Sequence, residues 1–563
     1  MRMVWKFHKT NPRGQKVLSS DLGITPVFAQ ILLNRDVRTP EQAQEFLFGR
    51  LSSCHDPFLM KDMRKGVDRI KKAIAGKERI LIYGDYDVDG VTSTALLADV
   101  LGRMGADYET FIPNRIEEGY GLNIRAVALA REHGVKLIIT VDCGINSAEE
   151  IECANNYGID VIVTDHHEVK TEVHPPAYAI IDPHQPDCPY PFNFLAGVGV
   201  VYKLARALMK GQEDAVDEHL DLVALGTVAD IVPLNGENRI LAKAGLKKLR
   251  RTDKAGLKAL MKVAGVEPEK LTCRHIGFAL GPRINAMGRV GSANVALDLL
   301  MCADAARASE IAGILERENR NRQNIQKGIL KEALERVETD VDLDNDKVIV
   351  LADEGWHPGI IGIVASRLTE EYGKPAILIA LDGDRGKGSG RGVAGFNLFE
   401  AINDAGEHLI DFGGHEQACG LKIEKENIRL FRETLNGAAE KHFLDKEARV
   451  PELTIDLDLP FSYIGVKLID ELRMLMPHGP GNSEPVFSTN GIKVKNNPRD
   501  IGRNGFKFLA TCGNLTCEAI TFRKNDISKP RPGESINLAY TPSINSWAGI
   551  DSIQLNIKDL QIV

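Results

Sequence analysis

The stretch RILIYGDYDVDG, residues 79–90, decides the fold and raises the first question about function. Its first half is short, apolar and β-branched, which is typical of a buried strand. Asp85, Asp87 and Asp89 then follow at every second position, before a glycine. The pattern D-x-D-x-D-G also opens an EF-hand calcium loop, but that loop follows a helix and ends on a glutamate, where this chain has Leu96. We therefore expect a carboxylate loop at the carboxyl end of a strand.

The same alternation of apolar strands and helical segments continues downstream. Apolar strands joined by helical crossovers predict a doubly wound α/β domain, with a parallel sheet covered on both faces. Such sheets bind ligands at the carboxyl ends of their strands. Further strands are expected at 107–113, 135–142, 159–165 and 177–183, with helices such as 91–105 and 123–134 between them.

Beyond this sheet the sequence pattern changes three times. The charged stretch 315–338 predicts a long, largely exposed connector helix, and a second α/β pattern starts at 347–353. Short strands with frequent turns after residue 451 predict a small β-barrel or sandwich. The predicted domains are an N-terminal segment at 1–70, a catalytic domain at 71–240, a helical connector at 241–343, a second α/β domain at 344–447 and the β-rich domain at 448–563.

Composition limits the class of protein. The chain has 563 residues, too many for one core, and 43% hydrophobic with 26% charged residues is ordinary for a soluble protein. No apolar run approaches a membrane span of roughly 20 residues, and the first residues lack the apolar core of a signal peptide. Nine cysteines without a C-x-x-C pair favour a reducing cytosol and argue against zinc. We expect a cytoplasmic protein without membrane contact, whose net charge of −8 leaves nucleic-acid binding to local patches.

More carboxylates and histidines follow later strands. Asp142 ends one strand, Asp165, His166 and His167 follow the next, and Asp230 lies near the end of an apolar helical run. Each aspartate alone could simply cap a helix, but four such sites at one sheet edge concentrate negative charge that needs a cation. Oxygen ligands with one or two imidazoles suit Mn²⁺ or Mg²⁺. Two such ions about 3.5–4 Å apart would support phosphodiester hydrolysis.

These motifs together resemble a known family. YGDYDVDGVTS, VDCG, TDHH and VADIVP, in this order, are similar to the DHH phosphoesterase superfamily. GWHPGIIGIVASRL (355–368), GSGRGV (388–393) and FGGHEQACG (412–420) resemble the DHH-associated domain as it occurs in the RecJ family of single-stranded-DNA exonucleases. With the β-rich C-terminus, the resemblance covers nearly the whole chain. It implies a two-metal exonuclease of DNA repair and recombination that degrades single strands from the 5′ end to 5′-mononucleotides.

The resemblance also implies roles for individual residues. Asp142, His166 and His167 are the expected catalytic residues, with Asp142 bridging two ions and His167 beside metal or phosphate. Pyrophosphatase-type members carry a histidine where this chain has Tyr83, so one ion would have fewer protein ligands. The expected metal residues are Asp85, Asp87, Asp89, Asp142, His166 and Asp230, with Asp85 the least certain match to the family's ligand set.

Two glycine-rich stretches are candidate phosphate sites. GDRGKGSGRG (383–392) places cations among glycines that could let backbone N–H groups approach an anion, although a flexible surface turn is the alternative. The P-loop spacing is absent, so nucleoside triphosphate hydrolysis is not indicated. GPRINAMGRVG (281–291) reads as a glycine-punctuated loop. The resemblance assigns substrate phosphates to Arg283, Arg289, Ser389, Arg391 and His415.

The C-terminal region carries a local basic excess. Between residues 491 and 531 there are nine Lys or Arg and three Asp or Glu, and nine minus three gives +6. Phe506, Phe508 and Phe522 interleave with these charges, either as base-stacking rings or as core aromatics beneath a solvated face. The resemblance implies an OB-fold and favours DNA. The candidate DNA-binding residues are Lys493, Lys495, Arg503, Lys507, Arg523 and Lys524.

Two other functions remain open from the sequence. A small-substrate DHH phosphoesterase, acting on oligoribonucleotides, cyclic dinucleotides or pyrophosphate, would need neither the connector helix nor the basic terminus. A non-catalytic DNA-binding relative should have lost several acidic ligands, and none of the four sites is lost here. By resemblance alone, the partners are single-stranded DNA, single-strand-binding protein and a helicase, and we expect a monomer.

Overall fold

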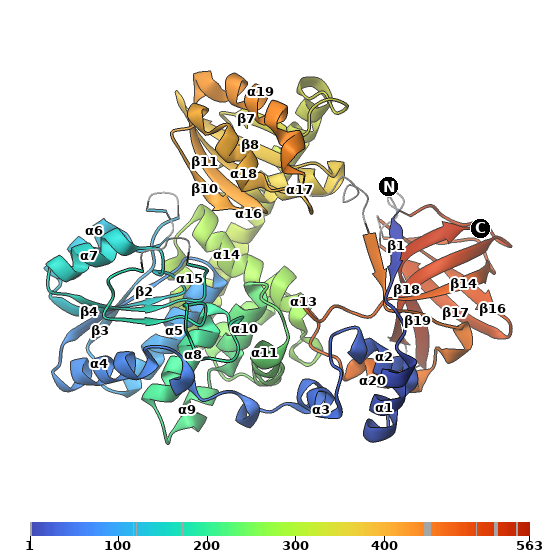
Figure 1. Ribbon diagram of the computed structural model, residues 1–563, viewed down its shortest axis with the longest axis horizontal. Coiled ribbons are helices and arrows are strands. Elements are labelled where there is room, and N and C mark those ends of the chain that lie inside the picture. Colours follow the sequence, from blue (N-terminus) through green and yellow to red (C-terminus); the bar gives the residue numbers. More distant parts are fainter. Residues whose placement is uncertain are drawn as a thin grey trace. The chain divides into compact units, whose positions relative to one another are not determined.

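The computed structural model describes residues 3–563 except 116–117, 120, 170–173, 444–451, 503, 523–526 and 548–549. The chain forms two compact units, whose elements are labelled in Figure 1. The central unit comprises Pro57–Asp230 and Lys248–Arg449. The terminal unit comprises Met1–Asp56, Ile231–Lys247 and Val450–Val563.

The first sheet of the central unit is parallel throughout, as predicted. Its strand order is β3-β2-β4-β5-β6. Because all the strands run the same way, the loops after β2, β4 and β5 leave the sheet at one edge. The strands are β2 (Arg79–Gly84), β3 (Tyr108–Phe111), β4 (Val135–Val141), β5 (Asp160–Thr164) and β6 (Ala179–Ile181).

Helices cover both faces of this sheet (Figure 1). On one face lie α6 (Ile124–Glu132) and α7 (Ala148–Asn156), which share a core with the alternate residues of β2, β4 and β5. On the other face lie α4 (Met63–Ala75), α5 (Val88–Arg103) and α8 (Gly197–Leu208). Two further helices follow, α9 (Glu213–Asp217) and the apolar α10 (Leu220–Ala229), which packs on α5 and α8.

A helical segment joins the two sheets of the central unit. It comprises α12 (Ala255–Val263), the short α13 (Cys273–His275), a π-helical turn η4 (Ile276–Leu280), α14 (Gly281–Val290), α15 (Ala293–Met301) and the connector helix α16 (Ala305–Asp340). The long connector is confirmed. One stripe of it, including Ile311 and Leu315, is buried.

The prediction of a loop at 281–291 was wrong, because this stretch forms α14. Pro282 lies in the first turn, where a missing N–H costs nothing, and Ile284 and Met287 are buried at helical spacing. The glycines serve close packing instead of a turn. A Cβ on Gly288 would lie 2.7 Å from the carbonyl oxygen of Tyr86.

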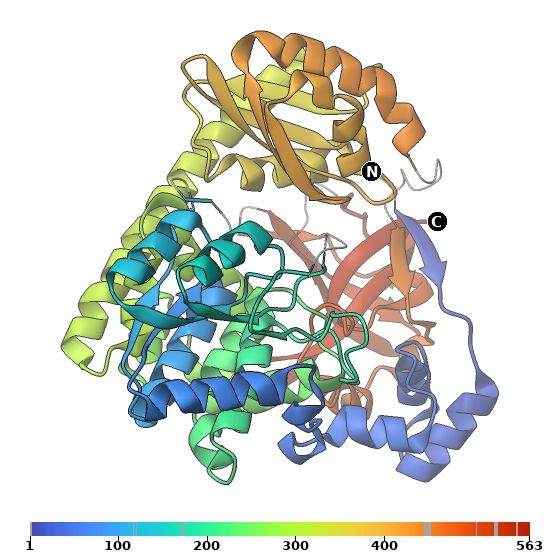
Figure 2. The same ribbon diagram turned by 60° about the vertical axis from the view of Figure 1, so that its left-hand side comes forward.

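The second sheet has the order β10-β11-β9-β8-β7, with only the β7–β8 pair parallel (Figure 2). The C-terminal half of α16 and α17 (Ile361–Tyr372) cover one face. The other face packs against α18 (Leu398–Asp404) and α19 (Ile428–Ala438). The strands are β7 (Ile349–Asp353), β8 (Ala376–Asp382), β9 (Arg385–Arg391), β10 (Asp411–His415) and β11 (Ala418–Glu424).

The glycine-rich stretch 383–392 is therefore largely a strand, β9, and not the flexible surface turn that the sequence left as the alternative. Its glycines alternate with charged and polar residues, and Gly386, Gly388 and Gly390 are buried toward the core. A Cβ on Gly388 would lie 2.6 Å from Cδ1 of Leu421. Because side chains alternate along a strand, Ser389 and Arg391 point to the opposite face.

A closed barrel forms the core of the terminal unit, which confirms the predicted C-terminal barrel. The pairings run β14-β18-β19-β17-β16, and β16 pairs back onto β14. Phe506 and Phe508 are core residues, whereas Phe522 is exposed. The strands are β14 (Phe487–Val494), β16 (Gly505–Cys512), β17 (Leu515–Thr521), β18 (Ser535–Trp547) and β19 (Ile550–Ile562), with short β13 (Leu457–Asp458) and β15 (Arg499–Ile501) at the margins.

The first residues of the chain pack on this barrel. β1 (Val4–Phe7) pairs in parallel with β12 (Glu452–Ile455). The helices α1 (Pro12–Leu22), α2 (Pro26–Leu33) and α3 (Pro40–Phe48) share its core, and α11 (Gly236–Leu249) and α20 (Val466–Arg473) complete the unit. Among the described residues, no single helix is long and apolar enough to cross a membrane. The helices α1 and α2, which are bent by 115° relative to each other, reach that length and apolar composition only when they are taken together.

We predict that Gly388→Ala lowers the free energy of unfolding of the second α/β domain by about 1–3 kcal/mol, because the added methyl group overpacks Leu421. Urea denaturation followed by tryptophan fluorescence measures this, since Trp356 is buried in that domain. Gly413→Ala is the matched control, because a Cβ there meets no atom within 4 Å. Equal stability of the two variants would contradict the packing assignment.

Candidate metal centre and phosphate site

The carboxyl edge of the first sheet gathers the predicted acidic and histidine residues. Three sets of side chains each offer ligand atoms that lie within 4.8 Å of one another. Asp142 and His166 each belong to two of these sets, so the sets form one continuous cluster. The sets are Asp85, Asp87 and Asp142; Asp89, His166 and Asp230; and Asp142, His166 and His167.

The loop after β2 caps helix α5 and also offers metal-ligand atoms. Asp87 is the N-cap of α5, and its Oδ1 accepts hydrogen bonds from the backbone N–H groups of Asp89 (2.8 Å) and Gly90 (3.1 Å). A Cβ on Gly90 would lie 2.4 Å from the carbonyl oxygen of Asp85, so this turn requires glycine. The Asp85 side chain is buried, and its Oδ1 has no hydrogen-bond partner.

Asp89 is fixed by the N-terminus of α8. The backbone N–H groups of Gly197 and Val198 donate to its two carboxylate oxygens at 2.6 and 2.9 Å. The helix dipole favours the negative charge at this position. Two glycines leave room for the carboxylates, because a Cβ on Gly197 would lie 2.6 Å from Oδ1 of Asp142, and one on Gly226 would lie 2.6 Å from Oδ1 of Asp89. Sequence reasoning missed both glycines, although each interrupts an otherwise apolar helical run.

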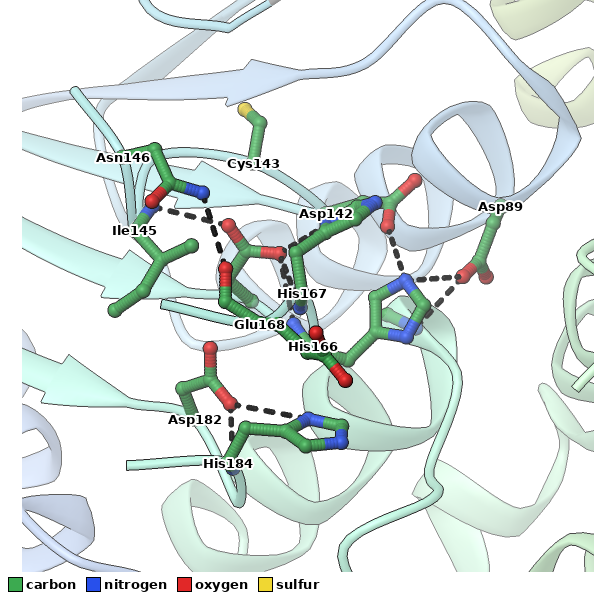
Figure 3. A network of polar contacts seen from close by, with 12 residues as sticks. Asp89, Asp142, Cys143, Ile145, Asn146, His166, His167, Glu168, Asp182 and His184 are labelled. Carbon is green, nitrogen blue, oxygen red and sulfur yellow. Dashed lines mark hydrogen bonds and ion pairs between the residues drawn. The ribbon is translucent and has the colours of Figure 1, made fainter. Parts of the chain in front are cut away.

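The His166 ring lies between the carboxylates (Figure 3). Its Nε2 is 3.1 Å from Oδ1 of Asp142, 3.7 Å from Oδ2 of Asp230 and 3.9 Å from Oδ2 of Asp89. Burial, together with the charge of His167, lowers the pKa of His166 to about 3, so the imidazole is neutral. The ring hydrogen-bonds to the backbone of Leu195, whereas Nε2 has no hydrogen-bond partner. A neutral imidazole held in this way is a typical metal ligand.

The carboxylates of the cluster repel one another. Burial and the charge of Asp87 raise the pKa of Asp89 to about 7. Burial, followed by the charges of neighbouring aspartates, also raises the pKa of Asp142 and of Asp230 well above the usual value for a carboxyl group. Asp142 in addition holds a left-handed backbone conformation with φ of +63°, which is strained for a residue other than glycine.

This donor set fits divalent metal ions. Oδ1 of Asp85, Oδ1 of Asp142 and Nε2 of His166 are buried without hydrogen-bond partners, which costs free energy in an apolar surrounding. Carboxylate oxygens with one imidazole nitrogen are the ligands that Mn²⁺ and Mg²⁺ accept. A bound cation would satisfy these atoms and cancel the repulsion.

Asp165 organises the loop that carries both histidines. Its Oδ1 accepts from the backbone N–H groups of His166 (2.7 Å) and His167 (3.2 Å), and Oδ2 accepts from Ile145 (3.0 Å). Oδ1 also lies 2.6 Å from Nδ1 of His167. Burial would raise the pKa of Asp165, but this contact with His167 lowers it to about 2. Burial likewise would lower the pKa of His167, but Asp165 raises it to about 9, so the imidazole carries a proton at neutral pH.

Tyr83 does not face the cluster. Its hydroxyl donates to the carbonyl oxygen of Gly121 at 2.8 Å and accepts from Nδ2 of Asn123 at 2.9 Å. Its ring stacks on Phe111 with the centroids 5.4 Å apart. The tyrosine therefore belongs to the core under α6, and the expectation that one ion has fewer protein ligands stays a prediction.

A cleft of about 230 Å³ opens beside the carboxylates. Arg115 lines it and lies over the Tyr86 ring, with its guanidinium carbon 5.1 Å from the ring centroid. Sequence reasoning missed Arg115, although it follows β3 at the same edge of the sheet. The cleft is lined by Asp85, Tyr86, Asp87, Arg115, His167, Asn285, Gly288 and Arg289.

Arginines converge on this side of the cluster. Burial lowers the pKa of Arg289 to about 10, and the nearby charges of Arg115, Arg322 and Arg391 act in the same direction. Burial, and then Arg115, also lowers the pKa of Arg391. Like charges gathered in this way favour an anion among them.

Ser389 and Arg391 lie together against the first turn of α17. The Arg391 Nη1 donates to Oγ of Ser389 at 3.2 Å and to the carbonyl oxygen of Gly390 at 2.7 Å. A Cβ on Gly362, in that turn, would lie 2.8 Å from Oγ of Ser389 and 3.0 Å from Nη2 of Arg391. These groups form the polar wall of the second α/β domain.

Two other predicted phosphate residues lie apart from this cleft. Arg283 donates to Oε2 of Glu316 at 2.7 Å and to the carbonyl oxygen of Ala279 at 2.6 Å. Its guanidinium therefore links the connector helix α16 to the π-helical turn η4. His415 is exposed. It pairs with Ala418 on β11, and Ala418 pairs with Arg391 on β9. His415 therefore lies two strands from Arg391, a distance of roughly 10 Å in total.

The basic residues of the barrel are only partly described. Lys493 and Lys495 are exposed, and Nζ of Lys507 forms an ion pair with Glu518 at 2.8 Å. Arg503, Arg523 and Lys524 lie outside the described residues. The DNA-binding role of this set stays a prediction.

A larger hollow of about 480 Å³ lies in the terminal unit. It is lined by Met3, Val4, Trp5, Phe7, Asn490, Asn537 and Gln561, none of which has a group that titrates or binds a metal ion strongly. The chemistry therefore belongs to the smaller cleft.

Comparisons with known proteins agree with this geometry. Family models match at residues 79–227 (DHH family, N-terminal domain), 345–441 (DHHA1 domain) and 455–559 (RecJ OB domain). Fold and site together define a DHH-type phosphoesterase.

Similar proteins narrow this class. The chain is 41% identical to the single-stranded-DNA-specific exonuclease RecJ of Bacillus subtilis, covering 100% of this chain and 71% of the relative. It is 34% identical to that of Escherichia coli, covering 95% and 96%. The chain belongs to the RecJ family.

Solved structures give the same result. The crystal structure of RecJ from Thermus thermophilus in complex with Mn²⁺ matches with a TM-score of 0.85 at 30% identity, covering 100% of this chain and 80% of that chain. The structure of the same protein with Mg²⁺ matches with a TM-score of 0.79 at 28% identity, covering 100% and 78%.

We predict that Gly197→Ala weakens Mn²⁺ binding at least about tenfold, because its methyl group would displace the Asp142 carboxylate. Isothermal titration with MnCl₂ measures the affinity. Gly199→Ala is the matched control in the same helix, since the three atoms nearest its Cβ all belong to the Leu195 side chain, with Cδ2 nearest at 3.2 Å. Unchanged affinity in Gly197→Ala would contradict the role of this glycine.

Proposed function

We propose that this chain is a metal-dependent exonuclease that hydrolyses single-stranded DNA from its 5′ end, releases 5′-mononucleotides and acts in DNA repair and recombination. The observation that carries the proposal is the buried carboxylate cluster around His166, directly beside a cleft lined by arginines. An anion-binding wall next to a cation-binding cluster is the arrangement that phosphodiester hydrolysis requires. The names of the relatives, single-stranded-DNA-specific exonucleases, support the substrate.

The cluster would hold two divalent ions, Mn²⁺ or Mg²⁺. We assign Asp142, whose carboxylate belongs to two of the ligand sets, as the shared ligand. When bound, the ions supply positive charge at the phosphoryl group and activate water. The other proposed ligands are Asp85, Asp87, Asp89, His166 and Asp230.

The remaining groups act on the substrate directly. Arg289, with Arg115, would hold the scissile phosphate and offset its growing charge in the transition state, whereas Arg391 would hold the terminal 5′-phosphate. His167 is protonated at neutral pH, and Asp165 holds its Nδ1. Its Nε2 is therefore the atom that would donate a hydrogen bond or a proton to a phosphate or leaving-group oxygen.

We propose that the 5′ polarity comes from the polar wall of the second α/β domain. Ser389 and Arg391, together with the first turn of α17, offer several donors to one anion, which suits the terminal 5′-phosphate better than a diester within the chain. We propose that Arg283 acts indirectly, through the turn that it holds, and that His415 contacts the backbone farther along the strand.

Further assignments rest on family resemblance. We propose the domain division given above, and a DNA track over the barrel through Lys493, Lys495 and Lys507. Binding to single-strand-binding protein and to a helicase, a monomeric state and a place in the cytoplasm are proposals of the same kind.

We predict that the purified protein with Mn²⁺ releases mononucleotides from the 5′ end of a single-stranded oligonucleotide labelled at either end. Duplex DNA should stay intact, and EDTA should abolish release. Asp142→Ala should show no release, whereas Asp68→Ala, which removes an exposed carboxylate on α4, should match the wild type. Release from the 3′ end, or full activity of Asp142→Ala, would contradict the proposal.

We predict that Arg391→Ala removes the preference for a 5′-phosphate over a 5′-hydroxyl end. A hydrogen bond from a charged donor contributes about 1.5–3 kcal/mol, so kcat/KM on phosphorylated DNA should fall roughly 10- to 150-fold. The rate on hydroxyl-ended DNA should change little. Arg385→Ala is the control, because this exposed arginine of the same strand pairs with Glu424. An equal loss on both substrates would argue against a terminal-phosphate site.

A further inference from the structure

Phe278 is the most exposed large apolar side chain in the described part of the chain, with 81% of its surface accessible. Its neighbours Ile276 and Leu280 are fully buried. Exposing a phenyl ring forgoes the free energy that its burial would give, so the ring has no packing role that explains it. None of the functions assigned above uses it.

The ring is carried by an unusual and well-anchored turn. Residues Ile276–Leu280 form the π-helical turn η4, and such single turns occur frequently at functional sites. Arg283 donates to the carbonyl oxygen of Ala279, inside this turn, and to Glu316 on α16. The backbone beneath Phe278 is thus tied to the connector helix, which restrains the point from which the ring extends.

The turn borders the metal cluster. A Cβ on Gly281, at the start of α14, would lie 3.6 Å from Cβ of Ala229 and 3.7 Å from Cγ2 of Val88. Ala229 and Val88 directly precede Asp230 and directly follow Asp87 in the sequence. Farther along α14, Oδ1 of Asn285 accepts from the backbone N–H of Val88 at 3.1 Å. The helices α10, α13 and α14 can be followed in Figure 1.

Phe278 lies close to these contacts along the chain. It is three residues before Gly281 in one continuous helical run, in which η4 leads directly into α14. Three residues advance a helix by less than about 5 Å along its axis. Gly281 is buried, whereas Phe278 is exposed.

We propose that Phe278 is a stacking platform for an unpaired base of the DNA strand whose phosphate lies at the metal cluster. The inference rests on the proposed function and names one of its specificity-determining contacts. Every base has a π-face, so an aromatic ring binds single strands without sequence preference. In a duplex each base is already covered on both sides and paired, and the platform therefore favours single-stranded substrate.

The test measures release of the first nucleotide under single-turnover conditions for wild type, Phe278→Ala, Phe278→Leu and Phe278→Trp. Phe278→Ala should lower kcat/KM roughly 5- to 150-fold, the range expected for loss of one base stack. Phe278→Trp should retain the wild-type value, and Phe278→Leu, which is apolar without a π-face, should resemble Phe278→Ala. Leu430→Ala, an exposed apolar truncation on α19, is the control that should change nothing.

An abasic residue placed in turn at each of the first six nucleotides locates the stacked base. At one position the abasic substrate should slow the wild type as much as Phe278→Ala slows cleavage of intact DNA. An abasic residue at that position should not lower the kcat/KM of Phe278→Ala any further. Equal kcat/KM for wild type and Phe278→Ala, or an additive loss at every position, would overturn the inference. A base-independent loss in Phe278→Ala would instead indicate a steric role.

Failure of the proposed function is a separate outcome. If the wild type releases no nucleotide with Mn²⁺ or Mg²⁺, the exonuclease proposal fails. The stacking inference is then decided by the dissociation constant of a fluorescent single-stranded oligonucleotide. It predicts binding that Phe278→Ala weakens and Phe278→Trp preserves, and it is contradicted if the two variants bind alike. Because the ring is exposed, melting temperatures should be equal across the series, which excludes misfolding as the cause.

Discussion

The repulsion among buried aspartates at one edge of a parallel sheet is the constraint on which the rest of the central unit depends. Asp85, Asp89 and Asp142 are almost wholly buried, and each has a pKa raised by burial and by neighbouring aspartates. An arrangement of this kind is costly by itself and becomes favourable when cations enter it. We infer that the fold is stabilised by its ions, so that function and stability are linked at this site.

The surrounding structure is built to keep these charges in place. The N-terminus of α8 holds Asp89 through two backbone N–H groups. Asp165 accepts hydrogen bonds from three backbone N–H groups, two of them in the loop that carries both histidines. Asp142 holds a left-handed backbone conformation, and its N–H donates to the carbonyl oxygen of Thr164 on the next strand. We propose that the substrate phosphate lies between the arginines that line the cleft and the ions held by the carboxylate cluster.

Sequence patterns predicted the sheet and the acidic cluster well. Short apolar runs indicate buried strands, and residues that follow such strands lie at the ligand-binding edge of a parallel sheet. Asp142 and His166 meet because strand ends of a parallel sheet meet, and Asp230 joins them from the C-terminal end of α10. Glycines were misread: the run around Gly388 is a strand and that around Gly288 is a helix, since a glycine needed for close packing looks in sequence like one needed for a turn. Arg115 and Gly197 were missed because their roles arise only when distant segments fold together.

The most direct test of the central claim is a crystal structure with Mn²⁺, in which anomalous scattering locates the ions independently of the protein coordinates. We predict two peaks about 3.5–4 Å apart, both within coordination distance of Asp142 and one beside Nε2 of His166. Absence of peaks at the cluster at saturating Mn²⁺, or peaks confined to surface carboxylates elsewhere, would contradict it.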